Sequence, residues 1–213
     1  MKKKSFFAVI AMIVTSPLWS QGRHQEAADG PFNIPTGPSV KLDGVISAGE
    51  WDHAVKVQIA VATNWTVTAL LQHDDKNLYV AFVNLRHAGV ERYPEVLLDP
   101  ANQKPLIWQK GQWWLHASYN LCESNVKPDE YASCTPSKPG WDATRFPLRG
   151  NVSEIAISLD KVGLSARSPF GIALDVTDTK GQWNFWPPAA RLTSPFSWQT
   201  AILAGSRELG IGK

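Results

Sequence analysis

Apolar side chains recur at every second position in four segments of this chain, residues 55–61, 65–71, 155–159 and 170–176. Successive side chains of a β-strand point to opposite faces of the sheet, so this alternation is typical of strands with one buried face. Residues 77–85 are apolar in both phases of the alternation, which predicts a central strand covered on both sides. Many short strands separated by turn-forming residues indicate an all-β fold. We predict an antiparallel β-sandwich of the jelly-roll or immunoglobulin-like type, with one short helical turn near residues 160–164.

The N-terminal residues 1–20 have the pattern of a secretory signal peptide. Three lysines precede a short apolar run at 6–14, and small and polar residues at 16–20 offer a cleavage site. Such a run is too short to cross about 30 Å of hydrocarbon, and no later segment is long and apolar enough. No cysteine lies near the cleavage site to carry a lipid anchor. We therefore expect a soluble periplasmic or secreted protein, cleaved near Ser20.

The rest of the chain divides into a leader and one domain. Residues 21–38 are rich in glycine, proline and polar types, which predicts a flexible leader. Residues 39–213 have the length of a single domain that can bury a sizeable core without a metal or disulfide scaffold. We expect this domain to be a monomer.

The charge of the predicted mature chain is close to zero. The full sequence carries 21 basic and 19 acidic residues, and the signal peptide removes three lysines and no acid, which leaves a net charge of −1. Nucleic-acid binding rests on many contacts between cationic side chains and phosphates. We therefore expect no nucleic-acid partner.

Cys122 and Cys134 bracket a polar stretch of the predicted domain. In an exported protein they are expected to form a disulfide, and closing so short a loop contributes about 3 kcal/mol at most. Two cysteines without a clustered histidine pair are a poor zinc signal. We expect no metal site and no cofactor, with a calcium ion that stiffens a loop as the open alternative.

Five short blocks occur in order along the predicted domain: Leu42-Asp43-Gly44 with Glu50-Trp51, residues 74–80 (DDKNLYV), residues 95–99 (EVLLD), residues 154–157 (EIAI) with the glycine strand 170–172, and residues 186–203, from Trp-Pro to an apolar strand. In this order and spacing they resemble family 9 carbohydrate-binding modules over about residues 39–204. The acids Glu95, Asp99 and Glu154 within these blocks are expected to make structural hydrogen bonds.

The resemblance implies non-catalytic carbohydrate binding. Modules of this family clamp a sugar between two aromatic rings, because the apolar C–H face of a pyranose packs on a ring while its hydroxyls need hydrogen-bond partners. One clamp position matches Trp186. The other aligns near Gly89, where the expected tryptophan is missing and Tyr93 could substitute if the loop is rearranged.

Further ligand-binding candidates come from the residues themselves. Trp114 shares its strand face with polar residues, and Trp141 and Trp183 occur in loop-like contexts. The charged candidates surround the predicted second clamp: Arg86, Glu91 and Arg92.

Two other functions stay open. Relatives of this sandwich bind b-type haem in periplasmic electron transfer, and here His116 or His73 would have to be the ligand because both methionines lie in the signal peptide. A non-sugar adhesion or scaffold domain is the third reading. Motifs of hydrolases, metalloproteases and nucleotide-binding enzymes are missing from the sequence. We expect no enzyme, with a role as an accessory to polysaccharide-degrading enzymes.

Overall fold

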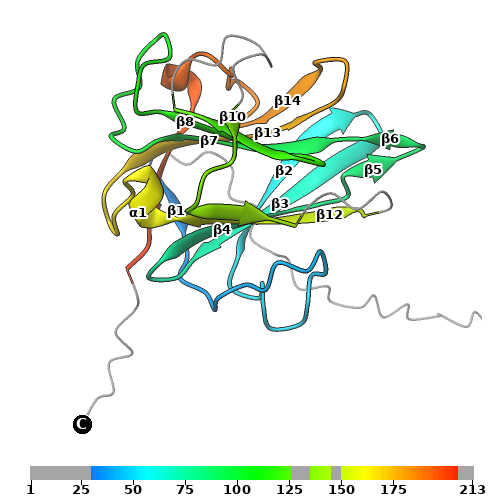
Figure 1. Cartoon of the computed structure of the whole chain (residues 1–213), viewed down its shortest axis with the longest axis horizontal. Coiled ribbons are helices and arrows are strands. Elements are labelled where there is room, and N and C mark those ends of the chain that lie inside the picture. The colour runs from blue at the N-terminus through cyan, green and yellow to red at the C-terminus, as the bar shows by residue number, and fades with distance from the viewer. Residues whose placement is uncertain (1–29, 126–134, 145–149, 206–213) are drawn as a thin grey trace, which may run out of the picture.

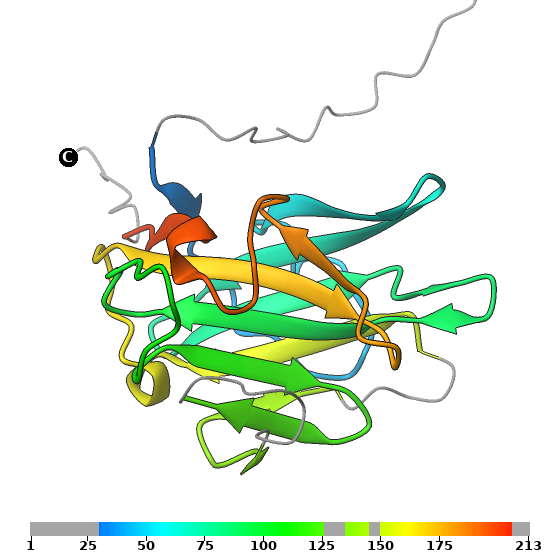
Figure 2. The same ribbon diagram turned by 90° about the horizontal axis from the view of Figure 1, so that it is seen from above.

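The chain folds into two packed β-sheets, as the alternation of apolar residues predicted. The computed structural model describes residues 30–125, 135–144 and 150–205, and Figure 1 shows the two layers one above the other. Sheet A has the strand order β1-β15-β13-β7-β8-β9-β10, with β14 paired to β13, and sheet B has the order β11-β12-β4-β3-β2. A hairpin of β5 and β6 extends from one end (Figure 2). Among the described residues, every strand pair is antiparallel except that of β1 with β15.

The strands are short, as expected for a sandwich. Those of sheet A are β1 (Phe32–Ile34), β7 (Tyr93–Asp99), β8 (Trp113–Ala117), β9 (Leu121–Ser124), β10 (Thr135–Pro136), β13 (Phe170–Thr177), β14 (Trp183–Trp186) and β15 (Gln199–Leu203). Those of sheet B are β2 (Val55–Ala62), β3 (Trp65–His73), β4 (Asn77–Val83), β11 (Trp141–Ala143) and β12 (Val152–Ser158), and the hairpin joins β5 (Arg86–His87) to β6 (Val90–Glu91).

Strand β4 is buried on both faces, which confirms the prediction of a central strand. Its side chains Leu78, Val80 and Phe82 lie in the main core between the sheets. The alternate side chains Tyr79 and Ala81 lie in a second apolar cluster on the outer side of sheet B.

The sandwich starts earlier than predicted. Strand β1 pairs with β15, and Ile34 is fully buried in the main core. The chain then stays attached to the domain, because His73 donates its backbone N–H to Pro35 and accepts from Gly37. The expected flexible leader over residues 21–38 is therefore wrong from Phe32 onward. Its glycine and proline content concealed a short edge strand.

A buried carboxylate joins two of the sequence blocks, the first and the fourth. Glu154 on β12 accepts from the backbone N–H groups of Asp43 at 3.0 Å and Gly44 at 2.8 Å, and from Trp51 Nε1 at 3.1 Å. Its burial raises the pKa of Glu154 although these donors oppose the rise. Asp99 likewise accepts from the N–H of Lys104 at 2.8 Å. Both acids thus make the structural hydrogen bonds that were predicted.

The predicted helical turn is present as α1 (Leu159–Val162). Ser158 caps its N-terminus by accepting from the N–H of Lys161, and Gly163 ends it in the left-handed conformation at φ 75°. The only other helix among the described residues is the short 3₁₀ turn η2 (Pro195–Ser197). Neither of these helices has the length and apolar composition needed to cross a bilayer.

Two predictions concern residues outside the described part. The predicted signal peptide falls within residues 1–29, which the structure does not describe. Cys122 lies on β9, whereas Cys134 falls in the segment that the structure does not describe. The signal peptide and the disulfide therefore stay predictions.

Candidate functional site

The outer face of sheet A, which points away from the other sheet, carries polar and aromatic side chains in cross-strand rows. Residues directly opposite one another in an antiparallel pair share a face. Thr177 on β13 lies opposite Tyr93 on one side and Trp183 on the other. In the next row, Asp175 lies between Glu95 and Phe185. Adjacent strands are about 4.8 Å apart, so Trp183 and Tyr93 start from backbones about 10 Å apart, with Thr177 between them.

A chain of buried polar groups lies beneath this face. His116 Nδ1 lies 2.7 Å from Glu95 Oε1, and Glu95 and Asp175 are both fully buried. Burial and the neighbouring Glu95 carboxylate raise the pKa of Asp175 well above its ordinary value. Glu95 Oε2 and Asp175 Oδ2 are both buried and accept no hydrogen bond from the described donors. A proton on Asp175, donated to Glu95, satisfies both oxygens at once and keeps the pair from carrying two buried charges.

An open groove lies over the end of this face, and we call it the tyrosine groove. It consists of two adjoining hollows of about 350 and 300 Å³, which share Tyr93, Asp178 and Thr179. The remaining lining residues are His116, Ser118 and Tyr119 in one hollow and Gly89, Val90, Glu91 and Lys180 in the other.

Two tyrosines form the aromatic wall of the groove. The rings of Tyr93 and Tyr119 meet edge to face with centroids 5.9 Å apart, and Tyr119 is 44% exposed. Both hydroxyls donate to Glu91 Oε2, Tyr119 at 2.9 Å and Tyr93 at 3.4 Å. Burial, with Tyr119 and Glu91 nearby, raises the pKa of Tyr93 to about 12. The wall therefore presents a neutral phenol and an accessible ring face.

The hairpin of β5 and β6 fixes the acid that these hydroxyls contact. Arg86 and Glu91 lie opposite each other in the hairpin and form an ion pair. The turn between them consists of Ala88 at φ 49° and Gly89 at φ 81°. Two consecutive positive φ angles are the geometry of a tight hairpin turn, in which glycine is favoured. Gly89, the position aligned with the missing clamp tryptophan, is thus at the tip of the hairpin and lines the groove as backbone.

Arg92 supports the β13–β14 turn, which lines the groove. Its Nη1 lies 3.3 Å from Asp178 Oδ2 and donates to the carbonyl oxygen of Gln182 at 3.0 Å. The guanidinium carbon lies 5.6 Å from the centre of the Trp65 ring. Asp178 also accepts from the N–H groups of Lys180 and Gln182, and these contacts lower its pKa although partial burial opposes them. Arg92 is buried, so it positions the β13–β14 turn and does not line the groove.

The two tryptophans of β14 lie on opposite faces. Trp186 is opposite Leu174, a main-core residue, and its ring packs at 4.7 Å from that of Phe32. It is half-buried against the core and lines neither hollow of the groove. Trp183 shares the outer face with Thr177 and is 43% exposed. Neither tryptophan lines the groove hollows, but the exposed Trp183 ring is on the same sheet face as Thr177 and Tyr93, whereas Trp186 packs against the core.

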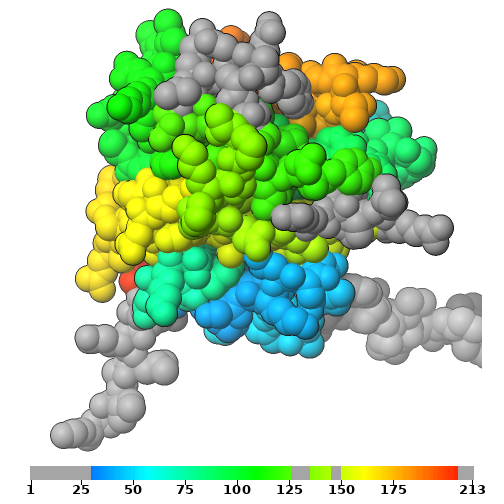
Figure 3. All heavy atoms as spheres, in the orientation of Figure 1, coloured from blue at the N-terminus to red at the C-terminus, as the bar shows by residue number. Residues whose placement is uncertain are grey.

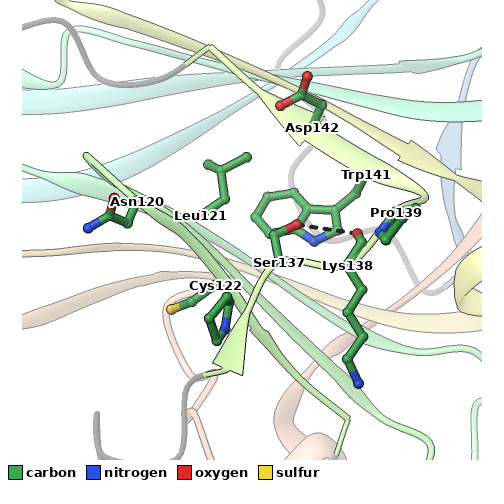
Figure 4. A pocket seen from close by; sticks show the side chains of 9 residues that line it. Asn120, Leu121, Cys122, Ser137, Lys138, Pro139, Trp141 and Asp142 are labelled. Carbon is green, nitrogen blue, oxygen red and sulfur yellow. Dashed lines mark hydrogen bonds between the residues drawn. The ribbon is translucent and has the colours of Figure 1, made fainter.

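Trp114 and Trp141 are both buried. Trp114 is on the outer face of sheet A, but a cluster with Trp108 and Trp198 covers it. Trp141 donates from Nε1 to Glu123 at 2.6 Å and packs in the main core. Trp141 also lines a separate hollow of about 670 Å³ between β9, β10 and β11 (Figure 4). Trp114 is 2% and Trp141 7% exposed, which corrects the expectation that both lie in open positions.

Some residues of the groove were missed by sequence reasoning. Tyr119 comes just after a strand, in a context typical of any surface turn. Asp178, Thr179 and Lys180 form the β13–β14 turn, and the sequence indicated the turn but not its proximity to Tyr93. The sequence did contain a signal for the buried pair, because Glu95 and Asp175 are acids inside strands that are otherwise mostly apolar.

Both histidines proposed as haem ligands contact protein groups through their ring nitrogens. His73 uses Nδ1 and Nε2 for the carbonyl oxygens of Asp74 and Ala204, at 3.0 and 2.9 Å. His116 uses Nδ1 for Glu95. Within residues 30–125, 135–144 and 150–205, no three His, Cys, Asp or Glu side chains cluster as a metal site.

Comparisons with known proteins find likeness in structure alone. The sequence matches no known family model and no curated protein. Two solved structures with a similar fold are family 9 carbohydrate-binding modules from Caldicellulosiruptor kristjanssonii. The one in complex with cellotriose has 15% identity and a TM-score of 0.59, covering 86% of this chain and 98% of that one. The one in complex with glucose has 15% identity and a TM-score of 0.58, covering 85% and 100%.

Proposed function

We propose that this chain is a non-catalytic carbohydrate-binding domain whose ligand occupies the tyrosine groove. The observation that carries the proposal is the exposed Tyr119 ring, fixed by Tyr93 and Glu91 at the edge of an open hollow. The shared fold with modules that were solved with cellotriose and glucose supports it.

The groove has the two kinds of surface that a sugar ring requires. The axial hydrogens of a pyranose make an apolar face that packs on an aromatic ring at about 3.5–4 Å. Its hydroxyls both donate and accept, so they need mixed partners. Glu91 supplies carboxylate oxygens, Lys180 an ammonium group and Thr179 a hydroxyl, all within the lining.

We propose that Trp183 and the tyrosine pair form the two sides of the ligand clamp. A ring held between two aromatic faces needs them about 7–8 Å apart, which is twice the contact distance. Backbones about 10 Å apart at Trp183 and Tyr93 leave this space once the side chains lean inward. Thr177 then forms the floor between them.

The buried acids are unsuited to hydrolysis. A glycosidase needs two carboxyl groups that face each other across the scissile bond, about 5–10 Å apart. Glu95 and Asp175 lie opposite each other on adjacent strands and are fully buried, and Glu95 contacts His116 Nδ1. Their function in this proposal is to hold the floor and to orient His116 beside the wall tyrosines.

The proposal extends to the setting of the domain. The signal-peptide pattern of residues 1–20 and the Cys122–Cys134 pair fit an exported, monomeric domain that brings polysaccharide-degrading enzymes to their substrates. Calcium is not required by any contact described above.

A broad glycan screen on the mature protein tests the function. We expect binding to a soluble sugar, and no release of reducing ends when the same glycans are incubated with the protein. Absence of binding to every glycan would remove the proposal, and a Soret band in the purified protein would replace it with the haem alternative.

A further inference from the structure

Three large apolar side chains are exposed together at the end of sheet A that is distant from the groove. Leu106, Ile107 and Phe196 are 71%, 67% and 62% exposed. They occur in two loops, residues 100–112 after β7 and 187–198 after β14. Figure 3 shows the first of these loops as a green projection at the upper left. We call this set the apolar tip.

The two loops are attached to each other and to a rigid base. Phe196 donates its backbone N–H to the carbonyl oxygen of Pro105 at 3.0 Å, and Trp108 donates its own to Thr193 at 3.1 Å. Beneath them, the indoles of Trp108 and Trp198 meet edge to face with centroids 5.3 Å apart. The backbone bond at Pro105 keeps Phe196 beside Leu106 and Ile107, so the tip is one surface built from two distant segments.

All charged residues of the two loops are cationic. Residues 101–112 and 187–198 contain Lys104, Lys110 and Arg191 and no acid, although the predicted mature chain has a net charge of −1. Lys110 and Arg191 are exposed, and neither forms an ion pair with a described residue. Arg191 is held close to Phe196, because its N–H donates to Ser197 Oγ at 2.9 Å.

The tip is too small for a stable protein interface. Three side chains expose a few hundred Å², whereas a stable dimer buries about 800 Å² on each partner. It is also convex and offers no strand edge to a peptide, since Leu106 and Ile107 lie outside every strand. Apolar side chains that project beside cations are the arrangement that inserts into a negatively charged lipid interface.

We propose that the apolar tip docks the protein on the surface of an anionic lipid bilayer. Leu106, Ile107 and Phe196 enter the boundary between headgroups and acyl chains, while Arg191 and Lys110 contact lipid phosphates. The tip follows Asp99 at one end of β7, and the groove lies at Tyr93 at the other end, about 20 Å away. Figure 2 shows the loop after β7 at the left and the hairpin of β5 and β6 at the right, so a protein docked by its tip keeps its groove free.

Sedimentation with vesicles tests this proposal. The purified protein is mixed with vesicles of phosphatidylcholine alone or of phosphatidylcholine with phosphatidylglycerol. We expect it to pellet with the anionic vesicles, less so in high salt. The variant L106S/I107S/F196S should lose affinity by about tenfold or more, because each serine removes apolar area from the inserted surface. The charge variant R191E should also pellet less.

The matched control is Val45→Ser, which removes an apolar side chain of similar exposure, 58%, from a different loop. It should pellet like the wild type. If the triple variant folds poorly, the single variant Phe196→Ser is tested in its place, with unfolding measured in parallel. Pelleting of the triple variant at wild-type levels would overturn the proposal. A dimer that the wild type forms and the triple variant does not would also overturn it, because the tip would then be a protein interface. Sugar binding is measured separately, so failure here leaves the proposed function intact.

Discussion

Asp175 lies directly opposite Glu95 across strands β13 and β7, and both carboxyl groups are fully buried beneath the tyrosine groove. Burial and the neighbouring Glu95 carboxylate raise the pKa of Asp175, which favours a protonated member and so avoids two adjacent buried charges. His116 extends the pair toward the groove, with Nδ1 at 2.7 Å from Glu95. The floor of the groove is thus a fixed hydrogen-bonded chain, and its protonation is linked to folding.

The first prediction concerns the pH dependence of stability. The pKa of Asp175 is raised in the folded protein, so the folded state binds a proton more tightly than the unfolded chain does. The stability linked to this group is fully present below the ordinary aspartate pKa and is lost as the pH rises through the raised value. Asp175→Asn should remove this loss, because its amide N–H₂ donates to Glu95 at every pH while its oxygen still accepts from Asn184.

Urea unfolding between about pH 4 and pH 8 measures the effect. Asp175→Asn should be at least as stable as wild type at the upper end, with a flatter profile. Asp175→Ala serves as the contrast and should lose about 1–3 kcal/mol near the lower end, because Glu95 Oε2 then has no donor. A profile of Asp175→Asn parallel to that of wild type would show that Asp175 is not the titrating group.

The two tryptophans of β14 predict opposite phenotypes. Trp186 packs against Phe32 and the core, so Trp186→Ala should cost about 2–3 kcal/mol of unfolding free energy, less than a fully buried tryptophan, and leave sugar affinity unchanged. Trp183→Ala should leave stability within about 0.5 kcal/mol, since its ring is largely exposed. Its sugar affinity should fall by about tenfold or more.

Calorimetric titration and urea unfolding of both variants separate these effects. If Trp186→Ala loses affinity while Trp183→Ala keeps it, the assignment of the outer face of β14 to the ligand is wrong.

The third prediction concerns the carboxylate that joins the sequence blocks. Glu154→Ala leaves the N–H groups of Asp43 and Gly44 and the indole of Trp51 without their acceptor. We expect a loss of about 3 kcal/mol in unfolding free energy, because one buried and two part-buried donors lose a charged partner. Glu154→Gln keeps one oxygen and should lose less. Equal losses in both variants would indicate that the charge, and not the count of acceptors, holds this segment.

The sandwich itself was predictable because burial on one or both faces dictates the apolar pattern of each strand. Leu78 to Phe82 illustrate this, since both phases of that run are apolar and both faces are buried. Strand β1 was not predictable, because three residues in a proline-rich stretch carry too little pattern. Its assignment depends on the distant β15, which the local sequence does not encode.

The site was predictable only in part. Glu91 and Tyr93 were expected in it because the family resemblance located the second clamp there, and both line the groove. Trp186 was assigned to it because it matches the other clamp position of the family. The residues of β14 are aromatic in both phases, so the sequence does not indicate which face each ring takes. The register of Trp183 with Thr177 decides that question. Tyr119 reaches the groove through tertiary contact with Tyr93, for which no local signal exists.

The central claim is that a sugar ring stacks beside Tyr119. Calorimetric titration of cellotriose into wild type, Tyr119→Ala and Tyr119→Phe tests it most directly. We predict that Tyr119→Ala weakens affinity by about tenfold or more, while Tyr119→Phe, which keeps the ring and loses only the hydroxyl bond to Glu91, stays within about threefold. Equal affinities for wild type and Tyr119→Ala, both well above background, would contradict the account, because the ligand would then lie outside the tyrosine groove.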